Sequence, residues 1–171
     1  SHIGTMTKSQ NPSMFFQSIN ELNLNQEKYR IDLIGNIHPD IKSYIQNNKY
    51  DNFIKIKPYM PHKDAIRKMC ESDFLLLVIP NTKKNMGIVT GKLFEYIRSM
   101  RKIIMIGTPN SDAAKIIAQT NSGVCFDYTE KNKIKHLLME NNLPATSNYQ
   151  QFSRESLTKT LSLVFERVHQ E

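Results

Sequence analysis

The sequence lacks any long hydrophobic run: the longest uninterrupted apolar stretch is residues 74–79. A helix that spans a bilayer needs about 20 apolar residues, so no transmembrane helix is predicted. The first residues contain no apolar stretch of the kind that a signal peptide has. We interpret residues 1–6 as an expression-tag remnant before an initiating methionine. A cytoplasmic protein is expected, and peripheral association of the full-length protein with the inner face of a membrane stays open.

Glycine, histidine and cysteine are too sparse or wrongly spaced for several familiar sites. Only Gly35 is present where a dinucleotide fingerprint needs three glycines, and Gly91-Lys92 lacks the upstream glycine of a P-loop. No G-x-S-x-G nucleophile elbow occurs. The histidines form no pair with metal-ligand spacing, so no metal site is predicted. Cys70 and Cys125 form no C-x-x-C and are expected to be small buried or half-buried side chains.

The chain of 171 residues is long enough for one domain, and residues 7–171 are predicted to form it. Its formal net charge of +7 calls for an anionic partner. Nucleic acid, an anionic membrane surface and a phosphate-bearing small ligand are the usual candidates. The sequence shows no clear helix-turn-helix, zinc finger or RNP aromatic pattern, so no nucleic-acid partner is predicted.

Apolar runs alternate with helical patterns over most of the chain. The expected strands are 31–34, 53–56, 74–79, 103–106 and 124–126. Helices are expected from about residues 40, 61, 90, 111, 132 and 153, the last of them amphipathic. Continuous apolarity over 74–79 indicates a central parallel strand that is buried on both faces. The alternation predicts an α/β, Rossmann-like doubly wound parallel sheet, whose ligands bind at the carboxyl ends of the strands.

The helix expected from residues 90 to 100 is the strongest candidate for binding chemistry. Thr90 can cap this helix, and Gly91 lets a ligand approach the backbone closely. Free amides and the positive dipole end at a helix start suit a diphosphate. Glu95 lies about one turn further on, where a ribose could donate its hydroxyls to the carboxylate. The alternative is a capped surface helix with an exposed glutamate and a solvated lysine pair in the loop before it.

Lysines near the carboxyl ends of the predicted strands explain part of the positive charge. Lys92 lies in the first helical turn, where a cation opposes the dipole and is disfavoured without an anion nearby. This mismatch predicts Lys92 as a phosphate ligand, since locally unfavourable residues often mark functional sites. Lys83 and Lys84 lie in the preceding loop, where solvated charge is the default; Lys84 is the loop residue included among the binding candidates.

Three ordered blocks of sequence carry a family resemblance. Residues 59–66 (YMPHKDAI) with 72–77 (SDFLLL) look like Y-x-P-H-x-E-A-L…A-D-x-L-L-L. Residues 90–96 (TGKLFEY) with 102–104 (KII) look like [ST]-x-K-L-[FY]-E-Y…G-K-P-[IV]-[IL]. Residues 111–117 (SDAAKII) with 122–124 (SGV) look like G-D-A-A-x-x-I…G-x-G-V. Together they resemble the C-terminal, donor-binding domain of retaining group-1, family 4-like glycosyltransferases of the GT-B fold.

The resemblance implies a nucleoside-diphosphate sugar as substrate, with no separate cofactor. By matching position, Glu95 would hold the ribose, helix-start amides would face the diphosphate, and the loop at 58–60 would border the base. The full set of expected binding residues is Pro58, Tyr59, Met60, Lys84, Thr90, Gly91, Lys92, Leu93 and Glu95. No catalytic residue is assigned, because the chemistry of a GT-B enzyme occurs in the cleft between two domains.

The implied enzyme transfers a hexosyl group from a UDP- or GDP-sugar to a glycan or lipid-linked acceptor in surface polysaccharide biosynthesis. Its other partner is the missing N-terminal, acceptor-binding domain, so the isolated domain should bind donor without turning it over. One departure concerns the paired-glutamate motif E-x7-E, whose first position here is Gly87. A non-catalytic nucleotide-binding or regulatory α/β module, which needs no second domain, is the alternative.

Overall fold

The computed structural model describes residues 1–23, 29–140 and 146–168, so parts of the predicted domain at 24–28, 141–145 and 169–171 lie outside the described residues. Its strands are β1 (His2–Ile3), β2 (Ile31–Ile34), β3 (Ile54–Lys57), β4 (Phe74–Val78), β5 (Lys102–Ile106) and β6 (Gly123–Phe126). Its helices are α1 (Ser13–Asn23), α2 (Pro39–Asn47), α3 (His62–Cys70), α4 (Gly91–Arg98), α5 (Asp112–Gln119), α6 (Lys131–Glu140) and α7 (Arg154–Val168), with 3-10 turns at Tyr50–Asn52 and Tyr149–Phe152. The prediction of an α/β fold is confirmed.

The strands of the described residues pair in parallel as two three-stranded sheets, and hydrogen bonds from Ser1, next to β1, to β4 join the two into one surface. On one side β1 pairs with β2, in the register His2 to Leu33, and β2 pairs with β3. On the other side β4 pairs with β5 and β5 with β6. The Ser1 amino group donates to the Phe74 carbonyl at 2.7 Å, and the Leu76 amide donates to the Ser1 carbonyl at 2.7 Å. The strand order is therefore β3-β2-β1-β4-β5-β6, with its switch point between β1 and β4.

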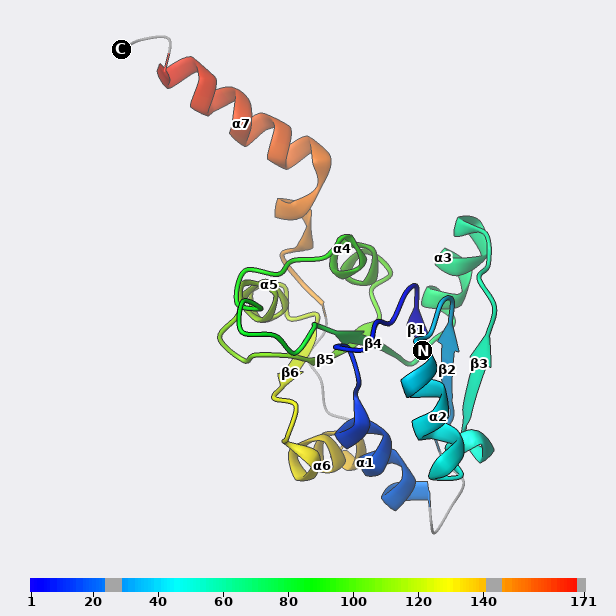
Figure 1. The fold of residues 1–171 in the computed structure, drawn as a ribbon. Coiled ribbons are helices and arrows are strands. Elements are labelled where there is room, and N and C mark those ends of the chain that lie inside the picture. The colour runs from blue at the N-terminus through cyan, green and yellow to red at the C-terminus, as the bar shows by residue number, and fades with distance from the viewer. Residues whose placement is uncertain (24–28, 141–145, 169–171) are drawn as a thin grey trace.

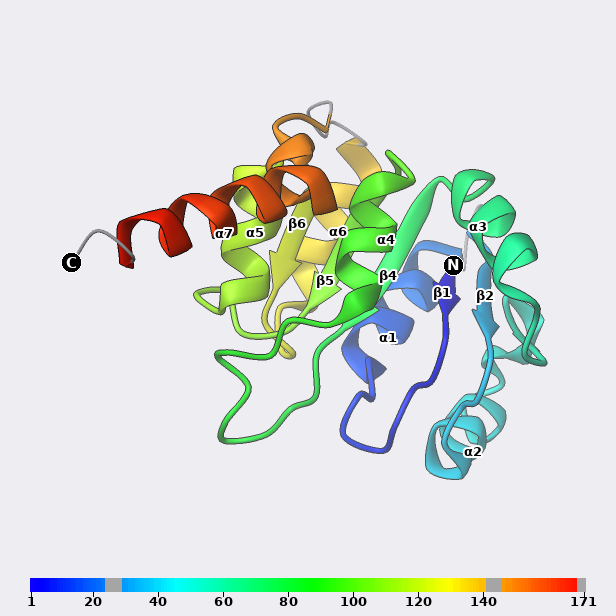
Figure 2. The same cartoon turned by 90° about the horizontal axis from the view of Figure 1, so that it is seen from above.

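Helices cover both faces of this sheet, as Figures 1 and 2 show. Helices α1, α2 and α6 pack on one face and share a core with Leu76 and Val78 of β4. Helices α3, α4 and α5 pack on the other face, with Leu75 and Leu77. Successive residues of a strand point to opposite faces, so burial on both sides requires the unbroken apolar run of β4. The prediction of a doubly wound sheet is confirmed.

Residues 1–6, which we interpreted as an expression-tag remnant outside the domain, are part of the fold in this structure. His2 and Met6 are fully buried, and His2–Ile3 is a central strand. The Met6 amide donates to the Asn36 carbonyl at 2.9 Å, which ties the segment to the loop after β2. Helix α1, which follows this segment, was also not predicted. A strand of two residues has too little local pattern to be recognised without its neighbours.

The side chains that α4 and α3 bury correct one expected position. The buried stripe of α4 is Leu93, Tyr96 and Ile97. Phe94 is half-buried and packs against Phe152, with ring centroids 5.8 Å apart. Cys70 is exposed rather than core, since α3 buries Ala65 and Met69 and turns Cys70 outward.

The last helix leaves the body of the domain. Helix α7 extends away from the layers in Figure 1, and none of its residues is buried. The apolar face predicted for this helix is therefore exposed, including Leu157, Leu161 and Phe165. Across the described residues, no helix combines the length and apolarity needed to cross a membrane.

Candidate functional site

A pocket lies at the carboxyl edge of the sheet, beside the switch point between β1 and β4. Its volume is about 170 Å³, and it opens between the ends of β1 and β2 and the helices α3 and α4. Its lining consists of Ile3, Gly4, Ile34, Gly35, Tyr59, Met60, His62, Ala65, Met69, Lys92 and Glu95. Ligands of open α/β sheets bind at this kind of position, so we take this pocket as the candidate site.

The pocket gathers several residues that the sequence predicted from separate blocks. Tyr59 and Met60 reach it from the loop after β3, and Lys92 and Glu95 reach it from α4. Tyr59 is 81% exposed, so its ring has no packing role that would compete with a ligand. Pro58 and Gly91 are exposed next to these residues without lining the pocket.

The start of α4 offers fewer hydrogen-bond donors than its sequence implied. Thr90 occupies the N-cap position, but its side chain makes no capping hydrogen bond, and its Oγ1 is buried without a partner among the described residues. The Leu93 amide donates to the Thr90 carbonyl at 3.1 Å, and its side chain lies in the core. The amides of Gly91 and Lys92 are left without an acceptor in the described parts of the chain. Two free amides thus remain at the positive end of this helix.

Lys92 is half-buried and turns back toward β1. Its Nζ donates to the Thr5 carbonyl at 2.8 Å and lies 3.5 Å from His2 Nε2. Burial lowers the pKa of Lys92, and the nearby Glu95 carboxylate opposes that shift. Since an ammonium has three N–H groups, a third donor remains for a ligand in the pocket.

Gly4 is a pocket residue that the sequence interpretation missed. Gly4 and Gly35 end adjacent strands with φ of 116° and 118°, a conformation that favours glycine. A Cβ at Gly35 would lie 2.6 Å from the Gly4 carbonyl oxygen, so the two turns approach more closely than side chains would permit. The signal was present as a repeated pattern, since His2-Ile3-Gly4 parallels Leu33-Ile34-Gly35.

Lys83 and Lys84 lie in the loop after β4, and neither lines the pocket. Both are exposed, whereas the neighbouring Asn85 is buried and fixes the loop. Asn85 Nδ2 donates to the Pro80 carbonyl and the Tyr128 hydroxyl, each at 3.3 Å, and its Oδ1 accepts from Thr108 Oγ1 at 3.1 Å. The structure therefore does not bring Lys84 together with the other predicted binding residues.

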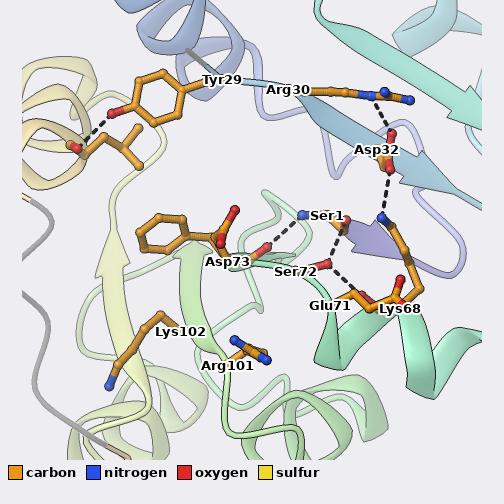
Figure 3. A pocket seen from close by; sticks show the side chains of 12 residues that line it. Ser1, Tyr29, Arg30, Asp32, Lys68, Glu71, Ser72, Asp73, Arg101 and Lys102 are labelled. Atoms are coloured by element: carbon orange, nitrogen blue, oxygen red, sulfur yellow. Dashed lines mark hydrogen bonds and ion pairs between the residues drawn. The ribbon is translucent and has the colours of Figure 1, made fainter.

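A larger pocket of about 570 Å³ lies at the opposite, amino edge (Figure 3). Its charged centre is Asp32, which is 7% exposed. The Asp32 carboxylate pairs with Lys57 at 2.9 Å and with Arg30 and Lys68, each at 3.3 Å. Burial acts to raise the pKa of Asp32, but hydrogen bonds from Lys57 and Lys68 outweigh it, so the pKa is lowered. None of the predicted binding residues lines this pocket, and its central charge is already neutralised by the protein.

Comparisons with known proteins bear on the fold. No family model matches the chain, and no curated protein matches it. Among solved structures it is similar to the pneumococcal O-GlcNAc transferase GtfA in complex with UDP and GlcNAc, with a TM-score of 0.64 and 17% identity over 98% of this chain and 36% of that one. It is also similar to WaaG, a glycosyltransferase involved in lipopolysaccharide biosynthesis, with a TM-score of 0.60 and 12% identity over 82% of this chain and 37% of that one. The chain has the fold of one half of a GT-B glycosyltransferase.

A third similar structure widens the range of chemistry that this fold supports. It is the Methanocaldococcus jannaschii UDP-GlcNAc 2-epimerase in complex with UDP-GlcNAc and UDP, with a TM-score of 0.56 and 12% identity over 97% of this chain and 45% of that one. The chain thus spans less than half the length of each of these three proteins. Structural similarity at identities this low establishes the fold alone. Function depends on the residues at the site.

Proposed function

We propose that the chain is the donor-binding domain of a retaining glycosyltransferase. The enzyme would transfer a hexosyl group from a UDP- or GDP-sugar to a glycan or lipid-linked acceptor in surface polysaccharide biosynthesis. A second, N-terminal domain of the same enzyme would bind the acceptor and complete the catalytic cleft. The full-length protein would work in the cytoplasm, where the inner face of the membrane presents lipid-linked acceptors.

The observation that carries the proposal is the convergence of Tyr59, Met60, Lys92 and Glu95 on one pocket at the switch point of the sheet. In this pocket the Glu95 carboxylate would accept hydrogen bonds from the ribose. The free amides at the start of α4 and the Lys92 ammonium would face the diphosphate. Tyr59 and Met60 would border the base. Lys84 would at most meet the distal end of the donor, since it lies outside the pocket.

The same groups supply a mechanism for the departure of the nucleoside diphosphate. Negative charge builds up on the diphosphate oxygens as the bond to the sugar breaks. Fixed amides and an ammonium that are already oriented stabilise this charge without reorganisation at the moment of reaction. The contribution of this domain would therefore be electrostatic, and groups that contact the acceptor would come from the other domain.

Two of the similar structures are complexes with UDP, one of a transferase and one of an epimerase. They support a nucleoside-diphosphate sugar as the ligand and make sugar-nucleotide epimerisation the second candidate activity. Incubating the full-length protein with UDP-GlcNAc separates the two. A transferase releases UDP in proportion to glycosylated acceptor, whereas an epimerase changes the sugar configuration at C2 without any acceptor.

The test of ligand class uses the 171-residue chain itself. Titration with UDP or GDP, followed by NMR, should give saturable binding with a Kd of roughly 10 μM to 1 mM, since half of the cleft is missing. Shifts should concentrate on residues 91–95 and 58–62. Saturable binding of duplex DNA, with no response to either nucleotide, would overturn the proposal. Donor binding without transfer in the full-length protein would favour a regulatory nucleotide-binding module.

A further inference from the structure

Three residues in and directly after β1 lie against the Lys92 ammonium, and we call them the β1 cluster: His2, Gly4 and Thr5. His2 is fully buried, and the Thr5 carbonyl accepts from Lys92 Nζ at 2.8 Å. A Cβ at Gly4 would lie 3.0 Å from both Cε and Nζ of Lys92. The path of the lysine side chain across β1 therefore depends on glycine at this position.

The hydrogen bonds of the His2 ring determine which of its nitrogens can accept from Lys92. His2 Nδ1 lies 2.9 Å from the Leu76 carbonyl oxygen, which can only accept, so Nδ1 carries the proton. His2 Nε2 then presents a lone pair, at 3.5 Å from Lys92 Nζ. Burial, together with the charge of Lys92, lowers the pKa of His2 to about 3, so the ring is neutral near pH 7. A neutral acceptor orients the ammonium without cancelling its charge.

Two acceptors on the β1 side leave one N–H of Lys92 for the pocket that this residue lines. A salt bridge at the same place would have neutralised the cation and weakened its attraction for an anion. We propose that the β1 cluster holds the Lys92 ammonium as a preoriented cation for the donor diphosphate, with His2 as a positioning residue. This inference rests on the proposed function and adds to it an account of how the cation is held.

Two variants of His2 separate its two hydrogen bonds. The amide nitrogen of His2→Asn can take the place of Nδ1 and keep the bond to Leu76, but the side chain is too short to reach Lys92. The amide of His2→Gln reaches the place of Nε2 and can accept from Lys92, but loses the bond to Leu76. His2→Asn removes a neutral acceptor while Lys92 keeps its charge, so the loss of a typical hydrogen bond predicts that UDP binding weakens by roughly five- to tenfold, with uridine binding unchanged. His2→Gln should keep most of the UDP affinity.

A matched control is available one turn further along α4. The Tyr96 hydroxyl accepts from the Ile3 amide at 2.9 Å and is fully buried, so it also links α4 to β1, with no hydrogen bond to Lys92 in the described parts of the chain. Tyr96→Phe should lower the melting temperature and leave the ratio of the UDP and uridine Kd values as in the wild type. If Tyr96→Phe changes this ratio as much as His2→Asn does, general loosening of β1 explains both, and the proposal is overturned.

Lys92→Arg tests the same idea without altering the buried strand. Arginine keeps the charge, but its planar guanidinium is bulkier than an ammonium and does not fit against Gly4. Lys92→Arg should therefore lose UDP affinity about as strongly as Lys92→Ala. Wild-type affinity in Lys92→Arg would show that charge alone suffices and would overturn the inference. If the wild type itself binds no nucleoside diphosphate, the proposed function fails instead.

Discussion

The two edges of the parallel sheet hold their charged side chains in opposite ways. At the amino edge, the buried Asp32 carboxylate is paired with three cations of the protein. At the carboxyl edge, Lys92 contacts a carbonyl oxygen and a neutral imidazole, and within the described residues it forms no ion pair with the nearby, exposed Glu95. A charge that is held in ion pairs within the fold contributes to stability, whereas a charge without an ion pair remains available to a ligand. The comparison predicts that substitutions at the two edges affect different measurements.

The largest effect should come from the amino edge and appear in stability. Asp32→Asn removes the charge that Lys57 and Lys68 approach, and should lower the free energy of unfolding by about 2–3 kcal/mol. Urea denaturation measures this loss. Because the pKa of Asp32 is lowered in the folded state, its contribution is present above the ordinary pKa near 4 and is lost as the pH falls below that value. The stabilities of variant and wild type should therefore converge in acid.

UDP binding of Asp32→Asn should equal that of the wild type, because the substitution lies at the opposite edge from the pocket. The contrast between the two edges would be contradicted if Asp32→Asn lost nucleotide affinity while its stability at pH 7 stayed unchanged. A matched substitution at the carboxyl edge is therefore needed beside it.

Glu95→Gln is that substitution. Glu95 is exposed, so the variant should keep its melting temperature. Loss of a hydrogen bond to a charged group should lower kcat/KM of the full-length enzyme by roughly ten- to a hundredfold, through the ribose contact. Steady-state kinetics with the donor varied measures this effect. Unchanged kinetics would make Glu95 a surface residue with no part in donor binding.

Lys92→Ala should affect both measurements, because Lys92 belongs to the pocket and is also tied to β1. UDP affinity should fall about tenfold while uridine affinity changes little, as titration calorimetry of both ligands would reveal. The helix dipole alone predicts a slight gain in stability when this cation is removed. The bond to the Thr5 carbonyl reverses that expectation, so the melting temperature should fall. A variant that is destabilised but binds UDP normally would leave Lys92 with a structural role only.

Much of the fold could be predicted because its signals are local. Two examples depend on residues that are close together in the sequence. One is the unbroken apolar run of β4, and the other is the cap of α5, where Ser111 Oγ accepts from the Ala114 amide. Tyr59 and Glu95 were predicted through family-like blocks, and the topology brings them to one pocket. Their binding roles stay predictions.

Long-range contacts could not be read from local patterns. β1 has two residues, and its identity as a central strand depends on partners more than 30 positions away along the chain, such as Leu33 and Leu76. The same is true of the partners of Lys92: Thr5 and His2 precede it in the chain by 87 and 90 positions. The sequence showed that Lys92 was locally mismatched with the helix dipole, but only the folded chain supplies the acceptors at Thr5 and His2.

The smallest effect should come from the lysines of the loop after β4. Lys83 and Lys84 are exposed and do not line the pocket, so Lys84→Ala should change the UDP Kd by less than about twofold. Its contribution acts through solvent and is screened by salt, so the difference from the wild type should vanish between low and physiological ionic strength. Lys83→Ala is the matched control, with the same charge change one residue away. If Lys84→Ala loses diphosphate affinity while Lys83→Ala and Lys92→Ala bind normally, the loop carries the phosphate contact and the start of α4 does not.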